Sequence, residues 1–275
     1  MQPFTFPDRV CLLTGAAGGI GAAMAHDLSG RGTRLALVDR DVAGLAAVAR
    51  SARLGGSPDV STHVVDLADG GDLVDLVADV TARHGGLDLL VNNAGVALGG
   101  RLDQVSLDDV DRLMQVNVRA VVALTMACLP VLRPGAHVVV MSSLFGLAAP
   151  AGQVAYATSK FAVRGFGEAL RHELAPTGTG VTVVHPGGVR TGIARSARMG
   201  AGVPATEAEQ GLAAMDRFLR MPPHRAARAV LLAVAARRGR LVLTPEARLL
   251  DLLVRLLPGR YWDVVARFAP QPGRR

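Results

Sequence analysis

Short apolar segments rich in valine and leucine alternate along the chain with longer segments rich in alanine and leucine. The apolar positions are consecutive rather than at every second residue, which is typical of strands covered by helices on both faces. We therefore expect strands at residues 9–15, 34–40, 61–67, 87–95, 137–143, 181–187 and 240–245, and helices at residues 70–84, 106–133 and 153–175. Ser106, followed three residues later by Asp109, is typical of a helix N-terminus.

This alternation predicts the fold class. Strand, helix and strand in repeated order imply parallel pairing with right-handed crossovers, and hence a doubly wound α/β sheet of about seven strands, a Rossmann fold. We expect one catalytic domain over residues 1–245 and a helical extension over residues 246–275. Residues 191–222, rich in Gly, Ala and Met, interrupt the rhythm, and we expect an irregular insertion that covers the substrate.

The composition narrows the class of protein. Half of the 275 residues are hydrophobic and only 4% are aromatic, which suits close packing of helices on a sheet. The formal net charge is +7, but no block of like charges and no zinc-ligand spacing occurs, which argues against a nucleic-acid or metal site. Cys11 and Cys128 lie in apolar segments, as buried free thiols do in a reducing compartment. The N-terminus has no signal-peptide pattern, so we expect a soluble, cytoplasmic protein.

A glycine-rich segment, TGAAGGIG at residues 14–21, follows the first strand and opens a helix. Glycines allow a tight turn whose backbone N–H groups approach a pyrophosphate at the positive end of the helix. The spacing departs from G-x-G-x-x-G, so a purely structural turn is the alternative. Asp39 ends the next strand, where a carboxylate accepts hydrogen bonds from both hydroxyls of an adenosine ribose. The same carboxylate repels a 2′-phosphate on that ribose, which favours NAD over NADP. Arg40 would partly offset that repulsion, and Asp39 has a helix-capping role as its alternative.

The segment AYATSK contains Lys160, which is the only lysine, and Tyr156, one of two tyrosines. Four residues apart on a helix, the two side chains share one face. A free phenol has a pKa of about 10, and a neighbouring ammonium lowers it towards the range useful for acid–base catalysis. A compact ammonium also donates to a ribose hydroxyl. The pair predicts a catalytic centre, with an exposed i,i+4 pair as the alternative.

Five motifs now occur in order: TGAAGGIG, NNAG at residues 92–95, SS at 142–143, YATSK at 156–160 and HPGGVRT at 185–191. Over residues 8–245 the chain resembles the short-chain dehydrogenase/reductase family, in its ordinary, non-extended branch. The resemblance implies an NAD(P)-dependent oxidoreductase that interconverts a secondary alcohol and a ketone, working as a homodimer or homotetramer. Two rivals stay open, an NADPH-dependent reductase of ketones or 3-oxoacyl thioesters, and a dinucleotide-binding regulator without turnover.

The resemblance also implies roles for single residues. Tyr156 would be the general acid/base and Lys160 would hold the nicotinamide ribose. Ser143, thirteen residues before the tyrosine, would hydrogen-bond the reacting oxygen, and Asn117 would support a proton relay through water to Lys160. Asp66 would meet the adenine, residues 93–95 the adenosine, and Pro186, Val189 and Thr191 the nicotinamide. The cofactor residues so implied are Gly15, Gly19, Ile20, Gly21, Asp39, Arg40, Asp66, Leu67, Asn93, Ala94, Gly95, Tyr156, Lys160, Pro186, Val189 and Thr191.

Three features leave alternatives open. His185 is either a catalytic base or a structural residue at a strand end, and the second is favoured because Tyr156 already fills the acid/base role. The segment 144–151 is apolar and suits a hydrophobic alcohol or ketone, whereas Arg195 and Arg198 would either bind an anionic substrate or lie in solvent. Residues 246–268 have apolar positions at helical spacing. We expect these residues to pack on the body of the protein or on a second subunit. The two alternatives are that they cover the substrate or lie on a membrane.

Overall fold

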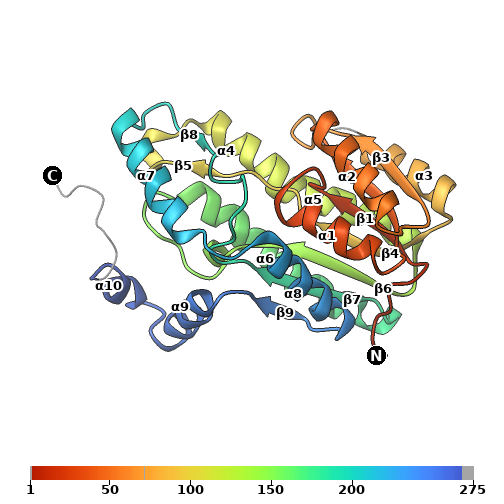
Figure 1. Cartoon of the computed structure of the whole chain (residues 1–275). Helices are drawn as coiled ribbons and strands as arrows, with labels where there is room; N and C mark the ends of the chain where they lie inside the picture. Colours follow the sequence, from red (N-terminus) through yellow and green to blue (C-terminus); the bar gives the residue numbers. More distant parts are fainter. Residues whose placement is uncertain (1, 71, 268–275) are drawn as a thin grey trace.

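A seven-stranded parallel sheet forms the centre of the computed structural model, which describes residues 2–70 and 72–267. The strand order is β3-β2-β1-β4-β6-β7-β9 (Figure 1), so the chain runs outwards from β1 in one direction and then from β4 in the other. This order confirms the predicted doubly wound sheet and its seven strands. The strands are β1 Val10–Thr14, β2 Arg34–Asp39, β3 Val60–Val64, β4 Leu87–Asn92, β6 Leu132–Met141, β7 Gly180–His185 and β9 Arg240–Val242.

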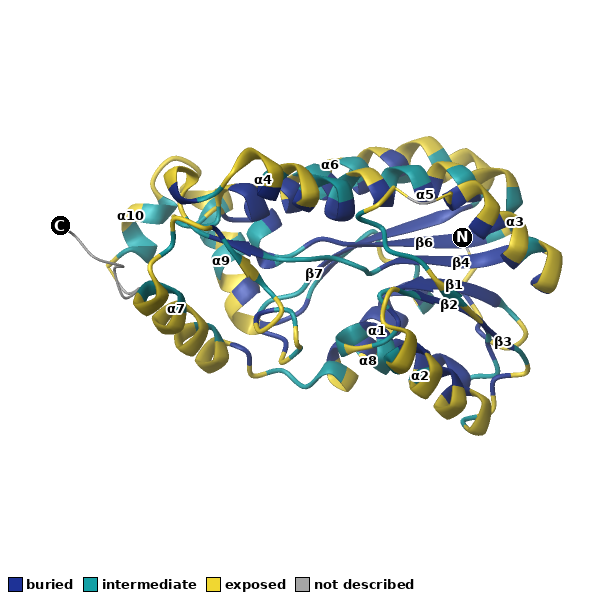
Figure 2. Cartoon of the chain, turned by 90° about the horizontal axis from the view of Figure 1, so that it is seen from above, coloured by how far each residue is buried: buried dark blue, intermediate teal, exposed yellow. Residues whose placement is uncertain are grey.

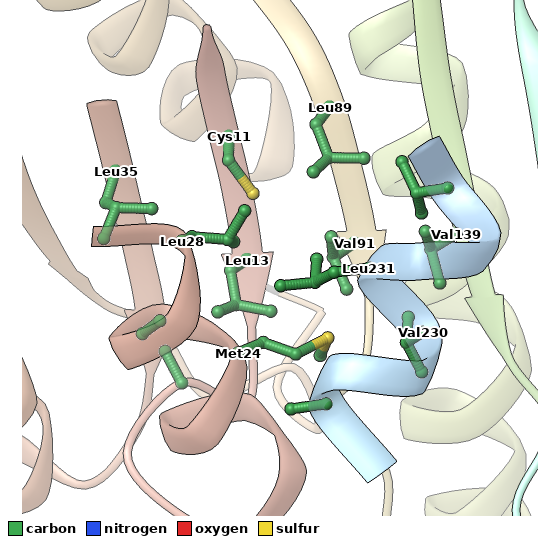
Figure 3. Packing of buried hydrophobic residues seen from close by; sticks show 14 of the residues in the cluster. Cys11, Leu13, Met24, Leu28, Leu35, Leu89, Val91, Val139, Val230 and Leu231 are labelled. Carbon is green, nitrogen blue, oxygen red and sulfur yellow. The ribbon is translucent and has the colours of Figure 1, made fainter. Parts of the chain in front are cut away.

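Helices cover both faces of the sheet (Figure 2). The first face carries α1 Gly19–Ser29, α2 Val42–Leu54 and α8 Pro223–Ala235, and the second carries α3 Leu73–His84, α5 Ala120–Cys128 and α6 Val154–Leu174. Leu13, Met24 and Leu231 pack together in the core of the first face (Figure 3). Cys11 and Cys128 are buried free thiols, as predicted, and burial raises the pKa of Cys128 to about 12.

The expected helix over residues 106–133 is divided. Ser106 caps α4 (Leu107–Met114) and exchanges hydrogen bonds with Asp109, which confirms the predicted N-terminus. A π-helix, η2 (Gln115–Arg119), then joins α4 to α5, and a 3₁₀ turn follows at Leu129–Val131. Among the described residues, one helical stretch, Leu107–Val131, is both long enough and apolar enough to cross a membrane, judged by length and composition alone. One side of α5 packs in the second core.

The prediction that residues 191–222 are irregular was wrong in part. Ala205–Phe218 forms the helix α7, because its alanines, glutamates and leucine favour a helix more than its single glycine opposes one. Two further strands, β5 (Leu98–Gly99) and β8 (Arg198–Met199), pair in parallel and fasten this insertion to the loop after β4. None of the residues of α7 is fully buried, so the helix stands over the end of the sheet rather than inside the core.

The C-terminal extension forms α9 (Pro245–Leu256) and the short α10 (Tyr261–Val265), and residues 268–275 lie outside the described part. Of the described tail residues, Ala247 is the one that is fully buried, while the side chains of Leu249, Leu252 and Leu256 are 70%, 52% and 68% exposed. These leucines therefore do not pack on the body of this chain. The tail contacts the segment 144–151 where the hydroxyl of Tyr261 accepts from the N–H of Ala149 at 3.1 Å.

Candidate active site

A cavity of about 460 Å³ opens at the carboxyl ends of the strands, beneath the insertion that carries α7. Ligands of doubly wound sheets bind at this edge, where the strand order reverses between β1 and β4. The lining brings together most of the residues that the sequence predicted for a dinucleotide and for catalysis. These are Gly15, Gly19, Ile20, Asp39, Asn93, Ala94, Gly95, Ser143, Tyr156, Lys160, Pro186, Val189 and Thr191.

The glycine-rich turn has the geometry that a pyrophosphate needs. Gly15 has φ +64°, and a Cβ there would lie 2.9 Å from the Cα of Ala94, so only glycine fits. Gly18 is the N-cap of α1 and provides no side-chain cap, and a Cβ there would meet no atom within 4 Å. The N-terminus of α1 therefore presents backbone N–H groups to the cavity, which fits an anionic group.

Asp39 supports this turn from the end of β2. One carboxylate oxygen accepts from the N–H of Ala17 at 2.9 Å and the other from the N–H of Asp41 at 3.0 Å. The cap of α2 is Asp41 itself, which accepts from Gly44. The helix-capping role that was the alternative for Asp39 thus belongs to Asp41. Asp39 itself lines the cavity and holds the glycine-rich turn through Ala17.

Five predicted site residues lie outside the described lining. Arg40 and Asp66 form an ion pair at 3.4 Å, and Leu67 lines a separate hollow beside η2. Gly21 faces away from the cavity into the turn, where an added Cβ would overlap the carbonyl oxygen of Gly15. Asn117 is buried. Gly21 packs against Gly15 and Asn93, and Asn117 approaches Gly95, so both lie behind residues of the lining.

Ser143 lies near Tyr156, and its side chain acts to lower the pKa of the phenol. The Ser143 hydroxyl also accepts from the N–H of Phe145 at 3.1 Å, whereas the Ser142 hydroxyl donates to the carbonyl of Lys160 at 2.8 Å. The two neighbouring serines thus have different tasks, and Ser143 is the one that meets the phenol. The Phe145 ring packs edge-on against the Tyr156 ring, with centroids 6.0 Å apart.

Burial dominates the protonation of the catalytic pair. It raises the pKa of Tyr156 to about 12, against the smaller opposing effect of the Ser143 side chain. It also lowers the pKa of Lys160 to about 8. The Lys160 ammonium donates to the Met141 carbonyl at 3.2 Å and lies 5.7 Å from the centroid of the Tyr156 ring. Contrary to the predicted lowering, the phenol pKa is raised in this structure, because desolvation outweighs the effect of the Ser143 side chain.

Asn117 lies in the π-helix η2 and is 1% exposed. Its amide oxygen accepts from the N–H of Val96 at 2.9 Å, and its amide nitrogen donates to the Val96 carbonyl and the Ser159 hydroxyl, each at 3.0 Å. A Cβ on Gly95 would lie 3.2 Å from Lys160 Nζ and 3.3 Å from Asn117 Oδ1, so both groups approach this glycine. The buried amide has its hydrogen-bond partners, as a lone polar group among valines requires.

The part of the cavity under the insertion is apolar, and sequence reasoning did not name most of its residues. Gln153, the N-cap of α6, is a polar residue of the lining that the sequence analysis missed, and its place one helical turn before Tyr156 is the signal that would have identified it. The described lining includes neither Arg195 nor Arg198, and Arg198 instead pairs with Asp109 at 2.9 Å. The apolar side chains are Leu98, Phe145, Ile193, Met199, Leu212, Met215, Phe218 and Leu219.

Known proteins resemble the chain in sequence. The family model described as short chain dehydrogenase matches residues 9–201. The SadH protein of Mycobacterium tuberculosis is 40% identical over 268 residues, covering 95% of each chain. Dehydrogenase/reductase SDR family member 7B of Bos taurus is 31% identical over 267 residues, covering 94% of this chain and 81% of that protein.

Solved structures resemble it in fold. A short-chain dehydrogenase/reductase from Burkholderia phymatum in complex with NAD is 27% identical, with a TM-score of 0.83 and coverage of 99% of each chain. A short-chain dehydrogenase from Burkholderia cenocepacia in complex with NADP is 30% identical, with a TM-score of 0.76 and coverage of 89% of this chain and all of that one. The chain therefore belongs to the short-chain dehydrogenase/reductase family of oxidoreductases.

Proposed function

We propose that this protein transfers a hydride between the nicotinamide of NAD(P) and a secondary alcohol or ketone. The observation that carries the proposal is the placement of Ser143, Tyr156 and Lys160 in one cavity with the glycine-rich turn at the N-terminus of α1. The turn fits a pyrophosphate, and the phenol and hydroxyl fit a single reacting oxygen. A pure sensor of dinucleotides has no need for Ser143, Tyr156 and Lys160 in one cavity, which argues against the regulator without turnover.

Each residue has a task in this reaction. The bound cofactor supplies or accepts the hydride. Tyr156 gives a proton to the substrate oxygen in reduction and takes it in oxidation, and the buried, protonated phenol suits the first direction. Ser143 hydrogen-bonds the same oxygen and stabilises charge as it develops there. Lys160 holds the nicotinamide ribose, and Gly95 lies next to both the Lys160 ammonium and the Asn117 amide.

NAD is the favoured cofactor. The Asp39 carboxylate lies in the cavity, where it would repel a 2′-phosphate, and the Arg40 guanidinium that would offset this is paired with Asp66. A titration that follows nicotinamide fluorescence with NADH and then with NADPH tests the preference. We expect tighter binding of NADH, and tighter binding of NADPH would overturn the choice in favour of the NADPH-dependent reductase.

The substrate is a hydrophobic alcohol or ketone. The segment 144–151 and the insertion contribute apolar side chains to the cavity, and the arginines of the insertion do not line it. A panel of alcohols and ketones of increasing apolar size, with small hydroxy acids and a 3-oxoacyl thioester included, tests this. We expect turnover to increase with apolar size, and preferential turnover of hydroxy acids or the thioester would contradict the assignment.

We further propose a cytoplasmic homodimer or homotetramer with no nucleic-acid partner. The buried free thiols Cys11 and Cys128 suit a reducing compartment. The exposed leucines of α9 suit a second subunit better than the body of the same chain. Cosedimentation with anionic vesicles tests the membrane alternative, and equal binding by the full chain and by a chain ending at Pro245 would remove it.

A further inference from the structure

His185 is the last residue of β7 and is fully buried next to the catalytic serine. Its Nδ1 atom lies 3.2 Å from the carbonyl oxygen of Ser143. A carbonyl oxygen only accepts, so Nδ1 carries the proton and donates it. The other ring nitrogen, Nε2, is buried and has no hydrogen-bond partner among the described residues. The hydrogen bond to Ser143 is therefore the one polar contact that this ring makes there.

The segment that holds Ser143 is hydrogen-bonded to the end of β7 and to the residue that follows it. The N–H of Ser142 donates to Val184 at 2.8 Å, and the N–H of Leu144 donates to Pro186 at 2.7 Å, so the two segments remain paired beyond the strands. The Ser143 carbonyl also accepts from the N–H of Gly146 at 3.0 Å, so the imidazole N–H is a second donor to the same oxygen.

Burial, assisted by two neighbouring arginines, keeps the ring neutral. Arg240 of β9 and Arg164 of α6 both disfavour a positive charge on His185, while Glu168 of α6 and the Ser143 carbonyl act in the opposite direction. Arg164 is paired with Glu168 at 3.0 Å, and Arg240 with Asp251 at 2.9 and 2.6 Å. Burial is the largest effect and lowers the pKa of His185 to about 4. The donor on Nδ1 is thus present throughout the neutral pH range.

We propose that His185 is a positioning residue for the reaction: its Nδ1–H holds the carbonyl of Ser143 and thereby keeps the Ser143 hydroxyl directed at Tyr156. This inference rests on the proposed function, because it assumes that Ser143 acts on the substrate. His185 is not a second base, since it lies outside the described lining of the cavity. Its contribution is the orientation of one peptide unit.

Two nearly isosteric substitutions test the proposal. In His185→Asn the amide nitrogen can occupy the place of Nδ1, whereas in His185→Gln it occupies the place of the unpartnered Nε2. We expect His185→Asn to retain kcat within about two-fold and His185→Gln to lose about 10- to 100-fold, because small displacements of a catalytic group are costly. KM and the affinity for NADH should change little in either variant. Equal kcat values for the two variants would overturn the proposal.

A second measurement needs no substrate. The ¹⁵N shifts of the imidazole in the wild-type protein report which ring nitrogen is protonated, and His185 is identified by the signal missing from either variant. We expect a neutral ring with the proton on Nδ1 between about pH 6 and pH 8. A proton on Nε2, or an imidazolium in this range, would overturn the proposal even if no substrate had been found. If the Nδ1–H tautomer is present and the wild-type protein turns over no alcohol or ketone, the proposed function fails instead.

Discussion

Replacing Gly21 by alanine tests the packing that positions the cofactor turn. An added Cβ would overlap the Gly15 carbonyl oxygen and lie 2.7 Å from Asn93 Nδ2 and 2.9 Å from the Gly15 carbonyl carbon. The obstructing atoms are mostly backbone, so they cannot rotate away. Overpacking of this kind costs up to about 3 kcal/mol.

A second effect acts in the opposite direction, because alanine is a better helix former than glycine by about 1 kcal/mol. Gly21 lies in the first turn of α1, so this gain applies only in part. The clash outweighs the gain in helix propensity, and we expect a net destabilisation of about 2 kcal/mol. For a chain of this size this lowers Tm by roughly 4–8 °C.

Thermal unfolding and NADH fluorescence together measure the outcome. We expect Gly21→Ala to lower Tm and to weaken NADH binding by about ten-fold or more, because the displaced turn no longer presents its N–H groups correctly. The matched control is Gly165→Ala in α6, where an added Cβ meets no atom within 4 Å. This control should raise Tm slightly and leave NADH binding unchanged. An unchanged Tm and unchanged NADH affinity for Gly21→Ala would refute the reasoning.

Two further predictions concern charge. Asp39→Asn removes the carboxylate charge, so the ratio of NADPH to NADH affinity should rise about ten-fold in the fluorescence titration, and an unchanged ratio would contradict the role of Asp39. His137 is buried against Thr182, and burial lowers its pKa to about 3. Its folded-state pKa is below the unfolded value, so its contribution is present above about pH 6.5 and is lost as pH falls towards 3. Between pH 7 and pH 5 the wild-type protein should lose about 2 kcal/mol of unfolding free energy that His137→Gln does not lose, measured by urea denaturation.

The long regular elements were predictable because local pattern decides them. The apolar runs at residues 9–15 and 87–95 have no stable place except between two layers of helices, and both form central strands. The two-residue strands β5 and β8 carry no such pattern. They pair because the insertion crosses the loop after β4, which is a tertiary event. The helix α7 was missed because the glycines of the whole insertion suggested irregular structure, although the alanines and glutamates of Ala205–Phe218 favour a helix.

The same limit applies to the site. Helical spacing paired Lys160 with Tyr156, and the resemblance to the family selected Ser143, thirteen residues before Tyr156. Protonation was not predictable, because the pKa of Tyr156 depends on how completely neighbouring segments exclude water. The place of Gly21 was also not predictable, since its role depends on the carbonyl of Gly15 rather than on a ligand.

The most direct test of the central claim follows the absorbance of reduced nicotinamide while the protein acts on a panel of hydrophobic ketones and alcohols. We expect the wild-type protein to oxidise or reduce the cofactor with at least one member. Tyr156→Phe should lower kcat by about 10²- to 10⁴-fold, the usual contribution of general acid–base catalysis, with little change in NADH affinity. A Tyr156→Phe protein that turns over the same substrate at the wild-type rate would contradict the account.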